Sequence, residues 1–171
     1  MAAFRSSPAL VLAPVLASCS FSFSAGGPDY EKLENGIADE LNSQYSAITQ
    51  EVSGVECPRQ QDRPKTGDVF LCEAGVENQK VRVEVTVEDG DNVSFQTIDT
   101  LFDLETTGRS LTRDVSAEYG FDVTVDCGEG LKVVPDGESF ECSAADRRGD
   151  TRTVRLTAGG PDSEDEWEIV D

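Results

Sequence analysis

Apolar residues recur at every third or fourth position in two stretches of the chain, a spacing typical of amphipathic helices. The first stretch lies near residues 30–50, and its apolar positions are Leu33, Ile37, Leu41, Tyr45 and Ile48. The second lies within 101–119, and its apolar positions are Leu104, Leu111 and Val115. Asp29 is the expected N-cap of the first helix, and Gly120 is the expected stop of the second. We therefore predict one helix in each half of the chain.

Strict alternation of apolar and polar residues predicts the clearest strand, over residues 81–87. Its apolar members are Val81, Val83, Val85 and Val87. Weaker strand signals, most of them bounded by Gly or Asp turns, lie at 54–57, 68–72, 92–98, 121–127, 138–142, 151–158 and 167–170. Each half then has about four antiparallel strands, with one sheet face buried under the helix.

Four cysteines form two pairs of equal spacing. Fifteen residues separate Cys57 from Cys72 and Cys127 from Cys142, and the second pair lies 70 residues after the first. The string Gly-x-x-Phe-x-Cys occurs twice at the same offset. Four cysteines allow three pairings, and the internal similarity favours Cys57–Cys72 and Cys127–Cys142. Neither pair has the Cys-x-x-Cys spacing of redox sites, so we interpret both as structural disulfides.

These patterns together predict an α+β fold of two tandem repeats, with unit 1 at 29–99 and unit 2 at 100–171. Each unit has one helix packed on an antiparallel sheet of about four strands, with one disulfide. A unit of about 70 residues buries little apolar surface on its own. A disulfide that closes the 15-residue loop within a unit contributes about 3 kcal/mol to the free energy of unfolding in the chain-entropy model.

The N-terminus has the pattern of an export signal. Arg5 is followed by the apolar run 9–17, which is too short to span a bilayer. The run ends in Leu16-Ala17-Ser18-Cys19, which is similar to a bacterial lipobox. We predict a lipoprotein signal peptide at 1–18, lipidation of Cys19, and a Ser/Gly-rich flexible tether at 19–28. The alternative is an ordinary signal peptide with an incidental cysteine near its end.

Composition excludes several function classes. The 171 residues include 34 Asp and Glu, 14 Lys and Arg, and no His, giving a formal net charge of −20. No basic patch can neutralise nucleic-acid phosphates, and catalysis by a histidine base is excluded. An EF-hand starting at Asp89 fails, because Ser94 and Thr100 stand where glycine and glutamate are needed. We predict no catalytic residue, cofactor or metal site, and so no enzyme; carboxylates alone remain as candidate catalytic groups.

One region resembles a known family. After the lipobox, Val55-x-Cys57-Pro58, Gly67-x-x-Phe70-x-Cys72 and the valine strand are similar to the actinobacterial envelope-lipoprotein domain of unknown function family numbered 4333. The resemblance is clear over 30–98 and loose over 100–170, where Gly128 replaces the proline. It implies an exported, lipid-anchored protein in the cell envelope, with no assigned activity and a diverged second copy.

The favoured function is therefore a non-catalytic binding or structural role at the outer face of the cell membrane. The protein is expected to contact the membrane through its N-terminal lipid and a protein or envelope partner through an acidic sheet face or a groove between the units. The alternative is an inhibitor of a secreted enzyme, because the outline is similar to the tandem-repeat β-lactamase inhibitor proteins of streptomycetes. An enzyme that uses carboxylates alone is the third class.

Overall fold

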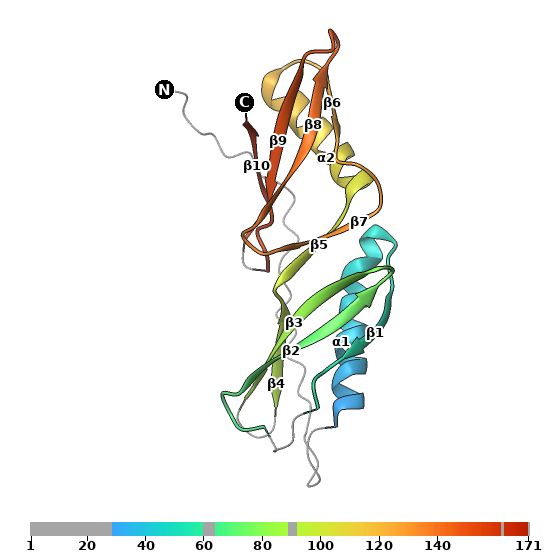
Figure 1. The fold of residues 1–171 in the computed structure, drawn as a ribbon, viewed down its shortest axis with the longest axis vertical. Coiled ribbons are helices and arrows are strands. Elements are labelled where there is room, and N and C mark those ends of the chain that lie inside the picture. The colour runs from blue at the N-terminus through green and yellow to red at the C-terminus, as the bar shows by residue number, and fades with distance from the viewer. Residues whose placement is uncertain (1–28, 60–63, 89–91, 162, 171) are drawn as a thin grey trace.

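The protein consists of two α+β units arranged end to end in an elongated body (Figure 1). The computed structural model describes residues 29–59, 64–88, 92–161 and 163–170. Each unit has one helix and a four-stranded antiparallel sheet, as predicted. Within the described ranges, no helix has the length and apolar composition needed to cross a membrane.

Unit 1 contains a sheet of order β1-β2-β3-β4 covered by helix α1. Its elements are α1 (Tyr30–Tyr45), a 3₁₀ turn η1 (Ser46–Ile48), β1 (Val52–Glu56), β2 (Val69–Val76), β3 (Gln79–Val87) and β4 (Val93–Thr97). Unit 2 has a sheet of order β10-β9-β8-β6. Its elements are α2 (Leu104–Tyr119), β6 (Val123–Asp126), β8 (Ser139–Asp146), β9 (Thr151–Thr157) and β10 (Glu166–Val170). An additional two-stranded sheet pairs β5 (Asp99–Asp103) with β7 (Leu131–Pro135).

The helix ends confirm the caps predicted at Asp29 and Gly120, and they add an N-cap at Asp103 that was not predicted. The Asp29 carboxylate accepts the N–H of Lys32 at 3.1 Å, and Asp103 accepts the N–H of Thr106 at 2.7 Å. A carboxylate at this position satisfies an N–H that has no partner inside the helix. Gly120 ends α2 with a φ of 71°, in the left-handed region that glycine enters at little cost.

The two units repeat each other, and they differ in the length of their connections. Their N-caps, Asp29 and Asp103, lie 74 residues apart, whereas the cysteines lie 70 residues apart. The four extra residues of unit 1 fall between the helix and the first strand, where unit 1 has the additional turn η1. In unit 2 the β8–β9 and β9–β10 links are longer than the β2–β3 and β3–β4 links of unit 1. The helices and strands of the two units therefore correspond, and the differences in length fall in the connections.

The core of unit 1 lies between α1 and the inner face of its sheet. The β3 valines and the α1 residues Leu33, Ile37 and Leu41 are all 3% exposed or less. Strand β2 extends to Val76, beyond the predicted end at residue 72, and continues the alternation of buried and exposed residues. The bridges Cys57–Cys72 and Cys127–Cys142 form as predicted, each joining the end of the first strand to the middle of the second.

The β5–β7 pair was not predicted from the sequence. Its strands lie between the two units and contribute side chains to both cores (Figure 1). Leu101 belongs to the core of unit 1, whereas the next residue, Phe102, belongs to the core of unit 2. Both faces of the pair are thus covered by protein, and apolar residues occur consecutively instead of alternating with polar ones. For this reason residues 99–103 were not recognised as a strand.

We expect loss of the Cys127–Cys142 bridge to destabilise the protein more than loss of Cys57–Cys72. Each bridge spans 15 residues and contributes about 3 kcal/mol to the free energy of unfolding. The core of unit 1 has more fully buried large side chains, so unit 1 retains more burial without its bridge. Urea denaturation of the two double-alanine variants measures the difference. Equal losses, or a larger loss in unit 1, contradict this prediction.

Candidate functional site

The predicted site residues that the structure describes have structural roles. Cys57 and Cys72 are buried in the core of unit 1, and Cys142 is buried in that of unit 2. All four cysteines are engaged in disulfides, so none is a free nucleophile or metal ligand. Cys19, the predicted lipidation site, lies outside the described residues. The remaining candidates for function are therefore the surfaces and the polar groups that the sequence pattern does not single out.

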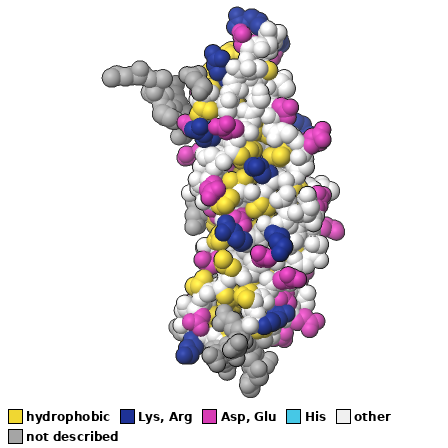
Figure 2. All heavy atoms as spheres, viewed as in Figure 1, with side chains coloured by type: hydrophobic (Ala, Val, Ile, Leu, Met, Phe, Trp, Pro, Cys, Tyr) yellow, Lys and Arg dark blue, Asp and Glu magenta, His cyan; other side chains and the backbone are white. Residues whose placement is uncertain are grey.

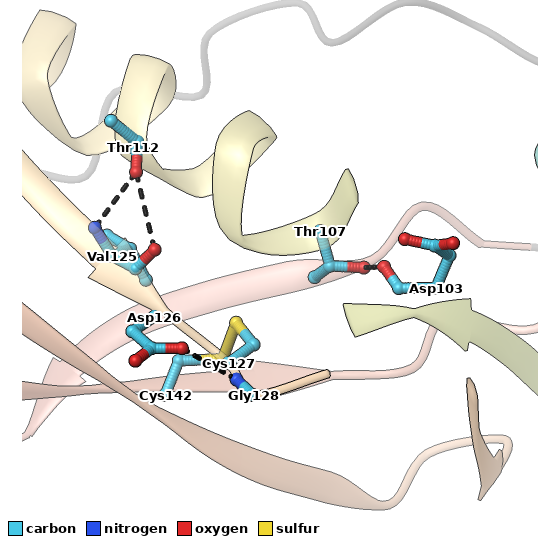
Figure 3. Close-up of a disulfide and its surroundings, with 8 residues drawn as sticks. All are labelled: Asp103, Thr107, Thr112, Val125, Asp126, Cys127, Gly128 and Cys142. Atoms are coloured by element: carbon cyan, nitrogen blue, oxygen red, sulfur yellow. Dashed lines mark hydrogen bonds between the residues drawn. A yellow bond between two sulfur atoms is a disulfide. The ribbon is translucent and has the colours of Figure 1, made fainter. Parts of the chain in front are cut away.

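Polar side chains of each helix close the outer edge of the neighbouring sheet. In unit 1, Asn42 accepts the N–H of Val52 at 2.7 Å, and Glu34 accepts the N–H of Cys57 at 2.9 Å. In unit 2, the Thr112 hydroxyl accepts the N–H of Val125 at 2.9 Å (Figure 3). The N–H of Val52 in β1 and the N–H of Val125 in β6 thus find hydrogen-bond partners within the protein.

Close packing at Gly108 allows the contact in unit 2. A Cβ atom at this position would lie 3.0 Å from the carbonyl oxygen of Val125. A groove of about 550 Å³ runs along this contact and is lined by Gly108, Thr112, Asp126 and neighbouring residues. Asp126 accepts the N–H of Gly128 at 2.8 Å, so part of its polar lining is already bonded within the protein (Figure 3).

An ion pair between a buried carboxylate and a partly exposed guanidinium lies where the two units meet. Asp99, at the start of β5, has only 3% of its surface exposed. Its carboxylate accepts the Arg82 Nε–H at 2.9 Å and the backbone N–H of Arg82 at 2.8 Å. Burial opposes ionisation of Asp99, but these hydrogen bonds outweigh it and hold its pKa below the ordinary value. The pair attaches β5 to β3 and so connects the units.

A second carboxylate at the junction has the opposite shift. Burial, together with the nearby charges of Asp99 and Asp165, raises the pKa of Asp136. Asp136 accepts a hydrogen bond from the Thr100 hydroxyl at 3.0 Å, which offsets part of this effect. Burial and the charges of Asp99 and Asp136 also raise the pKa of Tyr45. Asp99, Asp136 and Tyr45 do not line the groove along Gly108, and we assign them a structural role.

The end of unit 2 farthest from the start of α1 carries the most distinctive exposed surface. Tyr119 and Phe121 are 51% and 52% exposed, and their ring centroids lie 6.2 Å apart. Beside them, a groove of about 450 Å³ is lined by Phe121, Asp122, Arg147 and Arg148, among others. Arg147 forms an ion pair with Asp122. We call the surface made by Tyr119, Phe121, Arg147 and Arg148 the distal end.

The distal end carries paired charges of both signs, since Arg148 forms ion pairs with Asp146 and Asp150 in addition to the pair between Arg147 and Asp122. Figure 2 shows Lys and Arg side chains gathered over the turn between β8 and β9, at the top of the view. This surface was not predicted, because in the sequence Tyr119 and Phe121 flank the glycine that ends the helix and carry no signal of their own. Both side chains are about half exposed because of the way α2 ends. The spacing of apolar residues along the chain does not predict this exposure.

Among the described residues, no cluster of three Cys, Asp or Glu has a geometry suited to a metal ion.

We expect Asp99→Asn and Asp136→Asn to change the free energy of unfolding in opposite directions at pH 7. The lowered pKa of Asp99 stabilises the fold above the unfolded value of about 3.9, and this stability is lost as the pH falls through the folded pKa. Asp99→Asn therefore costs about 2 kcal/mol at pH 7.

For Asp136 the sign is reversed. Its raised pKa contributes stability that is fully present below the unfolded pKa and is lost as the pH rises through the folded pKa. Asp136→Asn keeps an acceptor for Thr100 and raises stability at pH 7. Urea denaturation at pH 7 and at pH 3 measures both effects, which shrink in acid. Changes of the same sign at pH 7 contradict the assignment.

Comparison with known proteins bears on unit 1. Residues 14–92 match the family model described as "Domain of unknown function (DUF4333)". The match includes α1, the Cys57–Cys72 bridge and β3, and it ends before β4. No curated protein and no solved structure matches the chain. This match confirms the family resemblance that the cysteine and valine pattern of unit 1 indicates. The description of the family assigns no function to it.

Proposed function

We propose that this is an exported protein, lipid-anchored through Cys19 at the outer face of the cell membrane, that acts by binding a partner without catalysis. The string Leu16-Ala17-Ser18-Cys19 supports the anchor. Two or more acyl chains hold a protein on a membrane durably, at about 0.8 kcal/mol for each buried CH₂ group. The match of residues 14–92 to the family supports the envelope setting that the resemblance implies.

The arrangement of the two ends of the body carries the binding proposal. The chain enters the folded body at Asp29, directly after the predicted tether, at the end of unit 1 (Figure 1). The distal end lies at the opposite end of the long axis, at the end of α2 and the β8–β9 turn (Figure 1). A protein anchored at Cys19 thus presents the distal end away from the membrane.

The composition of the distal end suits a protein partner. Exposed aromatic rings lose water favourably when a partner covers them, and Tyr and Arg are enriched at the centres of protein interfaces. Tyr119 and Phe121 offer two such rings, and Arg147 and Arg148 are more than 80% exposed. The aromatic turn is also what favours the second candidate function, an inhibitor that inserts this turn into a secreted enzyme.

Unit 2 is a diverged second copy of unit 1 in this proposal. The equal cysteine spacing, the Asp N-caps and the same order of helix and strands support a duplication. Unit 1 keeps the family pattern and lies next to the membrane anchor. Unit 2 departs from the pattern and carries the distal end, as expected if it has adapted to a particular partner.

We expect Cys19→Ala to release the protein from the membrane fraction or to leave it unprocessed. The thiol is the only group of residue 19 that can receive the lipid, whereas the hydrophobic run still directs export. Fractionation of cells followed by mass measurement of the protein tests this. Ser20→Ala is the matched control and leaves fractionation unchanged. A Cys19→Ala variant that remains with membranes at its normal mass contradicts lipidation.

We also expect the distal end to determine which partner is captured by chemical crosslinking in intact cells. The double variant Tyr119→Ser and Phe121→Ser should lower the yield of crosslinked partner at least fivefold, because it removes the aromatic contact area. Val69→Ser with Leu71→Ser is the matched control, since these are the other large exposed apolar residues among those described. A loss confined to that control would place the interface on the sheet of unit 1 instead.

A further inference from the structure

Four strands form the outer edges of the two main sheets, and β4 is the least protected of them. The helices close β1 and β6 with side-chain hydrogen bonds. Strand β10 carries Glu166 and Glu168, and charge is one device that blocks pairing with another chain. Strand β4 has the sequence Val-Ser-Phe-Gln-Thr, without charge or proline. Of the described strands, only β3 pairs with it.

Hydrogen bonds at the two ends of β4 show which main-chain groups face outward. The N–H of Ile98 donates to the Arg82 carbonyl at 3.1 Å, and the N–H of Glu88 donates to the Asn92 carbonyl at 2.7 Å. Bonded pairs in an antiparallel ladder recur every two residues, so positions 94 and 96 also bond to β3. The outward N–H and C=O groups belong to Val93, Phe95 and Thr97.

The core side of this edge favours apolar residues in an added strand. Val93 is buried in the core of unit 1, and Phe95 packs against its margin and is partly exposed. Both lie opposite buried valines of β3, which places them on the core face. Alternate residues of an added strand would lie beside Phe95 and extend the apolar layer.

The opposite face of the edge favours basic residues. Glu84 lies across from Gln96, and the exposed Glu88 accepts a hydrogen bond from Ser94 at 2.9 Å. A strand with Lys or Arg on this face complements these carboxylates. A second copy of the chain would bring another formal charge of −20 to the same edge, and this repulsion opposes a dimer.

We propose that β4 is a strand-addition site for an extended segment of a partner protein in which apolar and basic residues alternate. Main-chain hydrogen bonds to Val93, Phe95 and Thr97 supply the affinity. Phe95 on one face and Glu84 on the other supply the sequence preference. This site lies in unit 1 and stands on observations separate from those at the distal end, so either proposal can fail without the other.

Fluorescence anisotropy with a labelled nine-residue peptide of alternating Val and Lys tests the site, using the full chain in detergent. Thr97→Pro should weaken binding at least tenfold, because proline removes one outward N–H and its ring projects toward the added strand. The bond to β3 is untouched, and proline is tolerated on sheet edges. Thr97→Val keeps the N–H and should stay within twofold of the parent.

A second measurement does not depend on any change to the protein. Two peptides of the same sequence are N-methylated on alternate amides. One carries the methyl groups on the odd-numbered amides and the other on the even-numbered amides, so the two peptides have the same charge and amino-acid composition. Strand pairing predicts that one methylated peptide loses binding at least tenfold while the other keeps it.

Three results overturn the proposal. The first is that the two methylated peptides bind the parent protein equally well and that Thr97→Pro and Thr97→Val bind the unmethylated peptide equally well. This result indicates that charge attraction alone causes the binding. The second is no binding of the unmethylated peptide at about 1 mM, a concentration above the range of specific strand addition. The third is a dimer in sedimentation velocity that Thr97→Pro dissociates, which assigns the edge to a second copy of this chain.

Discussion

Burial of the β5–β7 pair on both faces determines how the two units combine. Leu101 and Phe102 are neighbours in sequence, yet they belong to different cores. Separation of the units would expose both side chains and break the pairing that supports them. The Arg82–Asp99 pair acts at the same place, because a buried carboxylate is tolerated only while it remains hydrogen-bonded. The units therefore form one body.

Small size explains much of the remaining structure. Each unit has a thin core, and both units use a disulfide at the same place to tie the first strand to the second. Their helices contribute more than an apolar face, since Asn42 and Thr112 also satisfy the outward N–H groups of the first strands. In each unit, one helix thus both covers the core and contacts the outer edge of the first strand. A unit of this length has no further helix that could contact this edge.

The surface is divided by the same architecture. The helix-covered faces and the junction are occupied by internal contacts. At the junction, Asp99 is hydrogen-bonded to Arg82, and Asp136 accepts a hydrogen bond from the Thr100 hydroxyl. Two surfaces that these contacts leave open are the distal end of unit 2 and the uncharged edge β4 of unit 1. The first offers aromatic rings and the second offers main-chain groups, so they suit different kinds of contact.

Local patterns in the sequence determined the two helices, their Asp29 and Gly120 boundaries, the β3 strand, the repeat and the cysteine pairing. Each depends on periodicity or spacing within one unit, and short-range physics decides it. Strand β5, the Arg82–Asp99 pair and the exposure of Tyr119 and Phe121 depended on the tertiary structure. They arise where segments distant in sequence meet: β5 has two buried faces and no alternation, Asp99 is one acid among 34 until Arg82 approaches it, and an aromatic residue near a helix end looks the same in sequence whether it is covered or exposed.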